Sequence, residues 1–411
     1  MEKNGKNLTD LLDMNRAQIL KYLAHHPECS RAELGAITGL TLPSITKIVR
    51  GLQENGIIYE TGFAEGKKGR RSVGLSISYD KFKVLAVKLS WQRLKISIFD
   101  ISGEKYGEDI SFPFESITLD SIENIMTILI DGIRQFQNEF PEIVAIGLAV
   151  PGPFYKKDGS LLLPPYTKNP EKRIYYSIEE KLKEKISLPV FIEHDADAGA
   201  LAYWWFYTSC DREQGIMNII ASAGIGGGIV ENGNVFSWNH GNSCELGHIS
   251  IKYDGRKCHC GSTGCIDAYS SFRSIQELAS QMLPDYPDSA LGKHPSISVQ
   301  TFFSAVKQKD TLAIKLLKDA GRYLGYAIVS LLSVFNPDIV LISDIMAMGG
   351  DLFLDEIKNA MISVQSTFSR IPELHLFDPT QDLVLLGAAT IAINSILSEP
   401  TKYLIRTKAD T

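Results

Sequence analysis

The chain has 411 residues, of which 44% are hydrophobic and 22% are charged, and its formal net charge at pH 7 is −6. This length predicts two or three domains, and the acidic net charge argues against a protein coated in nucleic acid. No apolar run approaches the roughly 18 residues of a membrane-spanning helix, and the first ten residues carry no secretion signature, so we expect a cytoplasmic protein with no membrane partner.

Residues 1–78 have the pattern of a winged helix-turn-helix domain, and they are net basic although the whole chain is acidic. A helix through NRAQILKYLAHH is followed by a second that opens with a capping box at Ser30 and Glu33, and by a third that Thr41 caps. The apolar residues of the third helix fall at i, i+3, i+4 and i+7 and should face a core. They are Ile45, Ile48, Val49 and Leu52. Two strands follow and form the wing, so the third helix is expected to read DNA.

The candidate DNA contacts lie on the third helix and on the wing. The outer face of the helix carries polar and basic side chains suited to base edges and phosphates. These residues are Ser44, Thr46, Lys47 and Arg50. The tip of the wing carries Lys67, Lys68, Arg70 and Arg71. The lysines would contact phosphates and the arginines could enter a minor groove. The alternative is a helical interaction module with a solvated polar face, but it leaves the basic wing tip without a use.

From about residue 81, short apolar segments typical of buried strands alternate with helical segments, which indicates an α/β body. The expected strands lie in VLAVKLSW, RLKISIFD, VAIGLAV, VFIEHD, IMNIIASAG and DIVLIS. The expected helices lie within 121–140, 177–185 and 313–335.

Two features of the body could bind a ligand. In the first, Gly224 and the glycines at 226–228 join two strands, where backbone amides could approach a phosphate or a sugar hydroxyl. A tight hairpin needs glycines too, and the spacing does not decide between these alternatives. In the second, Asp195 lies where a strand ends and a helix begins, which is where α/β sheets hold ligands. Its carboxylate could accept a hydrogen bond or a proton from a hydroxyl, or it could simply cap the helix.

A cluster of one histidine and three cysteines predicts a structural zinc site. Cys258, Cys260 and Cys265 lie on a glycine-jointed turn, and His248 lies ten residues before the first of them. One His and three Cys complete a tetrahedral zinc shell and leave no position for a reactive water, so the metal should hold the fold. His259 is a possible rival ligand that we expect to point away, and an incidental or redox cluster is the alternative.

With these residues placed, the chain resembles the ROK family, whose name stands for repressor, open reading frame and kinase. The resemblance covers nearly the whole length and rests on ELGH…CHCGSTGCID, SAGIGGG, AIGLAVPGPF and the strand-end Asp195. The basic segment GKKGRRSVGL looks like that of the family's sugar-responsive repressors, such as those of xylose and N-acetylglucosamine regulons.

The resemblance implies an actin-like ATPase fold with two α/β lobes, a sugar in the cleft between them, and a homodimer or a dimer of dimers. The implied lobes are 79–196 and 197–382, with a C-terminal helix at 383–411 packed on the first lobe. By motif, the sugar would meet His194, Asp195, Glu245, His248 and Asp267, with backbone near Gly152 or in the 224–228 loop. In that arrangement His248 gives one ring nitrogen to zinc and the other to a sugar hydroxyl.

Departures from the family kinases affect the nucleotide side. The kinases end their first body strand in Asp-x-Gly-x-Thr, whereas this chain has Lys88, Leu89, Ser90 and Trp91 there. Ser343 and Asp344 stand where glycines are expected, His194 replaces an Asn, and Asp267 replaces a Glu. Bulky side chains at 88–91 should obstruct a phosphate, so ATP binding is not expected.

We therefore expect a transcriptional regulator, a repressor of a sugar-utilisation operon, that binds operator DNA and is controlled by a sugar or sugar derivative in the cleft. The main alternative is an ATP-dependent sugar kinase with an appended DNA-binding head, in which Asp195 would be the general base. A third possibility is a regulator whose cleft is vestigial and whose DNA binding is set by a partner protein.

Overall fold

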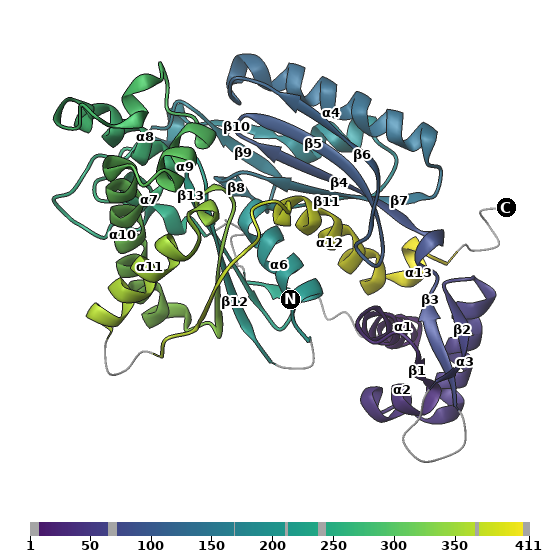
Figure 1. Cartoon of the computed structure of the whole chain (residues 1–411). Coiled ribbons are helices and arrows are strands. Elements are labelled where there is room, and N and C mark those ends of the chain that lie inside the picture. Colours follow the sequence, from purple (N-terminus) through teal and green to yellow (C-terminus); the bar gives the residue numbers. More distant parts are fainter. Residues whose placement is uncertain are drawn as a thin grey trace.

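The structure is a computed structural model that describes residues 8–64, 72–167, 169–209, 213–236, 244–365 and 370–405. Figure 1 shows a small N-terminal domain, which we call the head, beside a larger body in which two lobes face each other across the start of α12. The predicted wing-tip contacts Lys67, Lys68, Arg70 and Arg71 lie outside the described residues.

The head contains three helices and a small sheet in the strand order β1-β3-β2. Its elements are α1 (Leu8–His25), β1 (Cys29–Ser30), α2 (Arg31–Thr38), α3 (Leu42–Glu54), β2 (Ile58–Ala64) and β3 (Ser72–Ile77). Ser30 and Glu33 form the predicted capping box of α2, and the Thr41 side chain caps α3. The apolar face predicted for the third helix is buried, at Ile45, Ile48, Val49 and Leu52.

The first lobe is built on a five-stranded sheet in the order β11-β7-β4-β5-β6. These strands are β4 (Lys83–Ser90), β5 (Arg93–Asp100), β6 (Lys105–Pro113), β7 (Ile143–Val150) and β11 (Val190–His194). Helices α4 (Leu119–Glu139) and α5 (Ile178–Lys185) pack on this sheet. A smaller sheet contains β8 (Phe154–Tyr155), β9 (Ser160–Leu163) and β10 (Ile174–Ser177). Since β4, β7 and β11 are parallel, their carboxyl ends meet at one edge.

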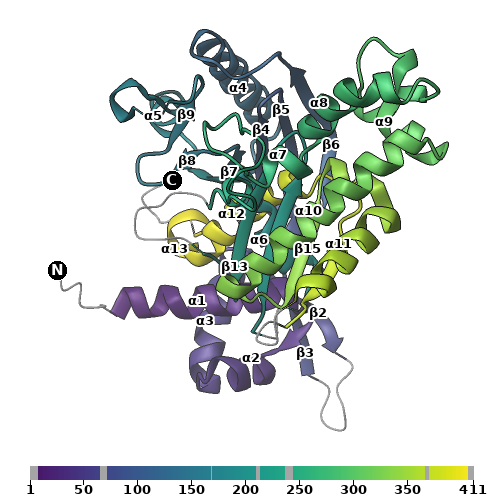
Figure 2. The ribbon, with the colours of Figure 1, turned by 90° about the vertical axis from the view of Figure 1, so that its left-hand side faces the viewer.

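The second lobe has a five-stranded sheet in the order β14-β13-β12-β15-β16. Its strands are β12 (Gly215–Ala221), β13 (Ile225–Glu231), β14 (Asn234–Val235), β15 (Ile339–Ser343) and β16 (Glu373–Leu376). Its helices are α7 (Asp267–Ser270), α8 (Phe272–Met282), α9 (Val299–Lys307), α10 (Thr311–Phe335) and α11 (Gly350–Val364). Figure 2 shows the long helices α10 and α11 lying side by side on the outside of this lobe. Short 3₁₀ turns occur in both lobes. They lie at Tyr79–Lys81 and Pro170–Lys172, before the second lobe, and at Leu246–His248, Leu283–Asp285, Ala290–Lys293 and Ile345–Gly349 within it.

Two buried helices, α6 (Asp195–Tyr207) and α12 (Leu383–Ser398), connect the lobes. They approach each other so closely that a Cβ added at Gly387 of α12 would lie 2.3 Å from the backbone oxygen of Ala198 in α6. On its other side α12 packs on β4, β7 and β11. A Cβ added at Gly147 of β7 would lie 1.8 Å from the backbone oxygen of Ala388. Glycine is thus required at positions where one backbone rests on another.

The C-terminal helix expected over 383–411 is divided. It ends at Ser398, and a separate helix, α13, covers Pro400–Tyr403. Proline lacks a backbone N–H and disfavours a helical conformation in the residue before it, which here is Glu399.

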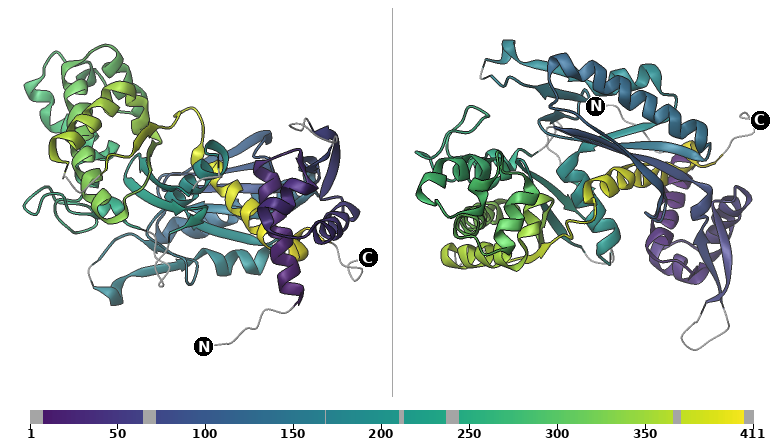
Figure 3. Two further views of the ribbon diagram at one scale, coloured as in Figure 1. Left: turned by 90° about the horizontal axis from the view of Figure 1, so that it is seen from below. Right: turned by 45° about the horizontal axis from the view of Figure 1, so that its top comes forward.

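The head is attached to the body through α1, which packs on α12 and α13. Arg16 Nη1 donates a hydrogen bond of 2.7 Å to Thr401 Oγ1, and the backbone N–H of Thr401 donates one of 3.1 Å to Asp13 Oδ1. At the end of α1, the His25 ring lies 4.4 Å from the ring of Trp205 at the end of α6. The left view of Figure 3 shows α1 lying across the C-terminal helices. Along the described ranges, no helix is long and apolar enough to span a bilayer.

Replacing Gly387 by Ala should destabilise the body, because the new Cβ would overlap the Ala198 backbone, which has no rotamer by which to move away. We expect a loss of about 1–3 kcal/mol in the free energy of unfolding, measured by urea or thermal denaturation. Gly51→Ala in α3 is the matched control, since its Cβ would have an ordinary 3.9 Å contact with Arg16. Equal stability of the two variants would contradict this close approach.

Candidate functional site

A cleft of about 830 Å³ lies between the two lobes. It is lined by the carboxyl ends of β4, β7 and β11 from the first lobe and by the loop between β12 and β13 from the second. All five side chains predicted to contact a sugar line this cleft. They are His194, Asp195, Glu245, His248 and Asp267. We call this group the polar floor. Residues that are far apart in sequence are thus brought to one surface, where parallel strands end.

A buried histidine organises one side of the polar floor. His194 Nε2 lies 3.3 Å from Asp195 Oδ1, and its Nδ1 lies 3.6 Å from Asp197 Oδ2. Burial alone would lower the pKa of His194, but Asp195, Asp197 and Glu245 raise it to about 9. Burial raises the pKa of Asp195 above its usual range, although His194 and Lys88 act in the opposite direction. Asp195 can therefore accept a hydrogen bond or a proton from a hydroxyl.

Gly152, at the end of β7, lets this cluster form. A Cβ added there would lie 2.7 Å from Glu245 Oε1 and 3.0 Å from His194 Nε2. A side chain at 152 would therefore displace both groups from the polar floor. The other side of the floor is fixed by Asp267, whose Oδ2 accepts a 2.8 Å hydrogen bond from the backbone N–H of Ile225.

The glycine-rich segment is a hairpin, and only Gly224 lies in its turn. The expectation that all four glycines join the two strands is wrong, because residues 226–228 belong to β13. A Cβ at Gly228 would lie 2.2 Å from the Ala196 backbone, so glycine there admits α6. A Cβ at Gly224 would lie 2.9 Å from Asp267 Oδ2. The glycines thus serve close packing and the approach of Asp267.

His248, Cys258, Cys260 and Cys265 present ligand atoms that all lie within 4.8 Å of one another. Zinc bonds of about 2.3 Å to sulfur and about 2.0 Å to nitrogen place two sulfurs of a tetrahedral site about 3.8 Å apart, and a sulfur and a nitrogen about 3.5 Å apart. The Cys260 and Cys265 sulfurs are 3.8 Å apart, and Cys258 Sγ lies 3.6 Å from His248 Nδ1. The cluster is therefore compatible with a tetrahedral metal, and it leaves His248 Nε2 for another partner.

His259 does not point away from the cluster, contrary to expectation. Its Nδ1 lies 3.8 Å from Cys258 Sγ, 3.4 Å from Asp267 Oδ1 and 3.0 Å from Arg273 Nη1. Cys258, His259 and Asp267 thus form a second possible metal-binding group that shares one cysteine with the first. The first group has four donors against three and matches tetrahedral spacing, so it is the better metal site.

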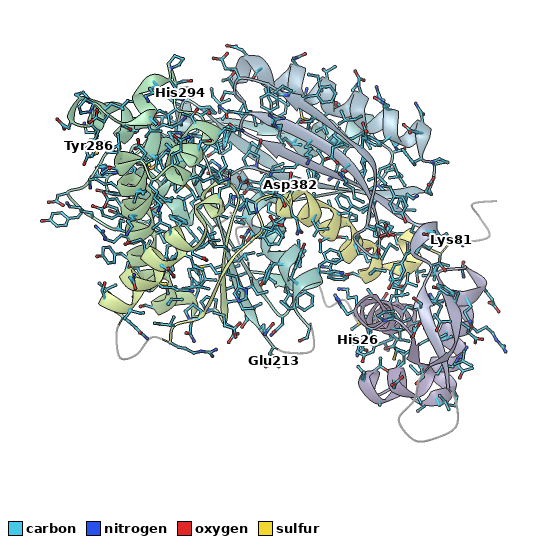
Figure 4. All side chains as sticks on the ribbon, viewed as in Figure 1. His26, Lys81, Glu213, Tyr286, His294 and Asp382 are labelled. Carbon is cyan, nitrogen blue, oxygen red and sulfur yellow. The ribbon has the colours of Figure 1, made fainter. Side chains whose placement is uncertain are left out.

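The side of the cleft where a kinase would hold phosphates contains a network of ion pairs. Lys88 Nζ on β4 lies 2.9 Å from Asp382 Oδ1 and 3.9 Å from Asp344 Oδ2, and Lys95 Nζ on β5 lies 3.5 Å from Asp382 Oδ2. Burial alone would lower the pKa of Lys88, but Asp382 and Asp344 raise it above its ordinary value. Burial would raise the pKa of Asp382, but Lys88 and Lys95 hold it below its usual range. Figure 4 places Asp382 between the lobes, at the start of α12.

Asp344 adopts φ 72°, the left-handed region that favours glycine. Its carboxylate accepts hydrogen bonds from Ser222 Oγ at 3.1 Å and from the Ile345 N–H at 2.7 Å. The backbone conformation expected of a glycine is thus kept, while a carboxylate has been added opposite Lys88. A non-glycine residue keeps such a conformation only where its surroundings compensate the cost.

Sequence reasoning missed several side chains that line the cleft, notably Tyr166, Arg273 and Asp382. Asp382 could have been found as an N-cap, because it directly precedes the apolar helix LVLLGAATIAI and accepts a hydrogen bond from the Leu385 N–H. Tyr166 follows two prolines in a loop, and Arg273 lies in an amphipathic helix; neither has a spacing that indicates a ligand.

On the head, the four predicted helix contacts are exposed along one face of α3. They are Ser44, Thr46, Lys47 and Arg50. Thr46 Oγ1 donates a 2.8 Å hydrogen bond to the Leu42 carbonyl within the helix, so it is less available than the two basic side chains.

Replacing Lys88 by Met should lower the free energy of unfolding by about 1–3 kcal/mol, because Asp382 would lose a hydrogen-bonded counter-ion and Asp344 an ion-pair partner. Lys105→Met, which removes a more exposed pair with Asp109, is the control and should cost at most about 1 kcal/mol. Because the pKa of Asp382 is depressed, the effect should be present at neutral pH and diminish as pH falls below about 4. Denaturation of both variants at pH 7 and pH 4 tests this, and a Lys88→Met variant as stable as the Lys105 control would contradict it.

Comparison with known proteins supports the architecture. A family model described as "ROK family" matches residues 87–395, and one described as "MarR family" matches residues 9–69. The N-acetylglucosamine repressor of Escherichia coli O6:H1 is 26% identical over 356 residues, which cover 86% of each chain. The xylose repressor of Bacillus subtilis is 26% identical over 389 residues, which cover 93% of this chain and 96% of its own.

Two solved structures extend the comparison. A crystal structure described as a ROK family transcriptional regulator, homologous to the E. coli MLC protein, is 27% identical, covers 95% of this chain and 97% of its own, and has a TM-score of 0.78. The ROK hexokinase of Thermus thermophilus is 25% identical, covers 77% of this chain and 99% of its own, and has a TM-score of 0.61. Since the ROK model spans most of the sequence, the chain belongs to the ROK family, with a helix-turn-helix-type domain ahead of an actin-like α/β body.

Proposed function

We propose that this protein is a transcriptional regulator, a repressor of a sugar-utilisation operon, whose DNA binding is controlled by a sugar or sugar derivative in the interlobe cleft. The observation that carries the proposal is the position of α6 and α12. Both helices begin at the cleft, with Asp195 and Asp382, and both end beside α1 of the head. Relatives named as N-acetylglucosamine and xylose repressors support the same class of function.

In this proposal the head binds DNA through α3 and the wing. The basic side chains Lys47 and Arg50 are exposed on a helix whose other face is buried, as expected for a helix that enters a major groove. We propose residues 1–78 as the DNA-binding domain, 79–196 as the first lobe with the C-terminal helices packed on it, and 197–382 as the second lobe. Two such heads on a homodimer or a dimer of dimers would bind the half-sites of an imperfect palindrome, and we place the protein in the cytoplasm.

Control by the sugar requires that it bind two arrangements of the lobes with different affinity. A sugar on the polar floor contacts Asp195 from the first lobe's edge, together with Glu245 and Asp267 from the second. Closing the lobes on it would shift α6 and α12 together, because their backbones are in contact. Trp205, near the end of α6, holds His25, and Thr401 of α13, which follows α12, holds Asp13 and Arg16. The head would therefore change its position when the cleft closes.

We further propose that the chain does not transfer phosphate. The Lys88 ammonium is paired with carboxylates where the kinases have an Asp that helps to position a metal ion, and the bulky side chain of Trp91 lies in the same replaced segment. Formation of ADP from Mg-ATP with any hexose would overturn this part of the proposal and favour a sugar kinase.

The ion that we propose for the Cys/His cluster is zinc, one per chain. Residues His248, Cys258, Cys260 and Cys265 would hold it with no position left for a substrate, so its contribution is structural. Metal bound at Nδ1 of His248 fixes the tautomer and the angle of this ring, whose Nε2 would then meet a sugar hydroxyl.

The proposal is tested by fluorescence anisotropy of the full-length protein on DNA from upstream of its own gene, while sugars and sugar phosphates are added one at a time. A change in DNA affinity caused by one compound at micromolar to millimolar concentration is the expected result. Binding to DNA that no compound alters would favour control by a partner protein, and the absence of DNA binding would overturn the proposal.

The Arg50→Ala variant should bind operator DNA about 5- to 100-fold more weakly, since the guanidinium contacts either a base edge or a phosphate. Arg134→Ala, on the exposed side of α4 in the body, is the matched control. Anisotropy titrations at physiological salt give both affinities. An unchanged affinity of the Arg50 variant would show that another face of the head binds DNA.

The Cys260→Ser variant should lose the bound metal, because a serine hydroxyl does not replace a thiolate as a zinc ligand. We expect close to one zinc per wild-type chain and less than about 0.2 per variant chain by elemental analysis, with weaker sugar binding in the variant because His248 is no longer held. Cys29→Ser, in the head, is the control. Sugar affinity that is unchanged while zinc is absent would contradict the positioning role.

A further inference from the structure

The cleft extends past the polar floor along a row of side-chain rings. The rings of His248, His259, Tyr166 and Trp91 follow one another with centroid separations of 5.3, 6.2 and 6.4 Å. All four residues line the cleft, and we call them the aromatic row. His248 and His259 come from residues 248–265, which carry the cysteine cluster and which we call the cysteine-rich loop. Tyr166 lies in the loop after β9 and Trp91 in the turn between β4 and β5, so three separate segments form the row.

The aromatic row is longer than one sugar ring. Opposite hydroxyl oxygens of a six-membered sugar ring are about 5–6 Å apart, which is about one centroid separation of the row, whereas the row contains three such separations. A single sugar bound to Asp195, Glu245 and Asp267 is therefore too short to extend along the whole row to Trp91. A sugar ring has an apolar face formed by its C–H groups, and an aromatic side chain that lines a ligand cleft can pack against this face. Tyr166 and Trp91 therefore remain available to a further ring.

Polar side chains accompany the far end of the row. Gln92 follows Trp91 in the β4–β5 turn, Arg93 begins β5, and Ser116 lines the same cleft. A hydroxyl-rich ring beside Trp91 would find donors and acceptors there. A phosphate is less suited to the adjacent ion-pair network, because Lys88 and Lys95 are already paired with Asp382.

We propose that the effector contains at least two sugar rings, of which the polar floor binds one and Tyr166 and Trp91 bind the next. This inference rests on the proposed function, since it specifies the sugar that the same cleft takes. The Trp91 side chain would then have two effects. It obstructs the binding of a phosphate, and it provides an aromatic surface for the second sugar ring.

The test is calorimetric titration of the full-length protein with matched pairs of sugars: glucose and cellobiose, xylose and xylobiose, and N-acetylglucosamine and its β-1,4-linked dimer. Glucose 6-phosphate is included as a charged alternative. For at least one pair the disaccharide should bind about tenfold or more tightly than its monosaccharide. In Trp91→Ala and in Tyr166→Ala that ratio should fall by about 2- to 12-fold, the usual contribution of one aromatic contact.

Tyr253→Ala is the control, because this tyrosine is 91% exposed on the cysteine-rich loop and lies outside the cleft. It should leave the ratio of affinities unchanged. Monosaccharides or glucose 6-phosphate that bind as tightly as every disaccharide, or a ratio that survives both Trp91→Ala and Tyr166→Ala, would overturn the inference while leaving the proposed function intact. The absence of binding by every sugar in the panel would overturn both.

Discussion

The close packing of α6 against α12 is the contact on which the rest of this structure depends. Gly387 lies against the backbone of Ala198, and Gly147 lies against the backbone of Ala388. The first-lobe sheet, α12 and α6 are therefore packed directly on one another. Asp195 at the start of α6 and Asp382, the N-cap of α12, contribute carboxylates to the cleft, while Trp205 near the end of α6 and Thr401 of α13 hold α1. Two helices in backbone contact cannot slide freely, so in the proposed function a change at the cleft would be transmitted to the head.

In the proposed function, one side of the cleft binds the sugar and the other side no longer binds a nucleotide. His194, Asp195, Glu245 and Asp267 still converge around Gly152 and Gly224, which suits a hydroxyl-rich ligand. Where phosphates would lie, Lys88 on β4 is joined to carboxylates on the second lobe and at the start of α12. In the proposed function, this arrangement suits a protein that responds to a ligand without converting it.

Local patterns in the sequence predict much of this arrangement. The capping residues predict the helices of the head, and the periodicity of the apolar residues predicts the buried face of α3. The chemistry of metal ligands predicts that His248 and the three cysteines cluster. The alternation of strands and helices predicts that Asp195 lies at the end of a strand. Contacts between distant segments do not follow in this way. Lys88 and Asp382 are separated by 294 residues, and no local pattern pairs them. The orientation of His259 depends on Asp267 and Arg273, and the place of the glycines in β13 depends on the approach of α6. The break before Pro400 is a local effect that the sequence does indicate, because proline disfavours a helical conformation at Glu399.

The proposed function requires that the cleft and the head be energetically coupled. It is tested most directly by measuring the affinity of the effector sugar for the protein alone and for the protein saturated with its operator. Linkage requires that DNA change the sugar affinity by the same factor by which the sugar changes DNA affinity, and coupling of this kind is typically about 5- to 150-fold. We predict that the change in sugar affinity caused by DNA equals the change in DNA affinity caused by the sugar and lies in that range. In the Trp205→Ala variant both factors should fall toward one. Tight binding of both ligands with affinities that do not depend on each other would contradict the account.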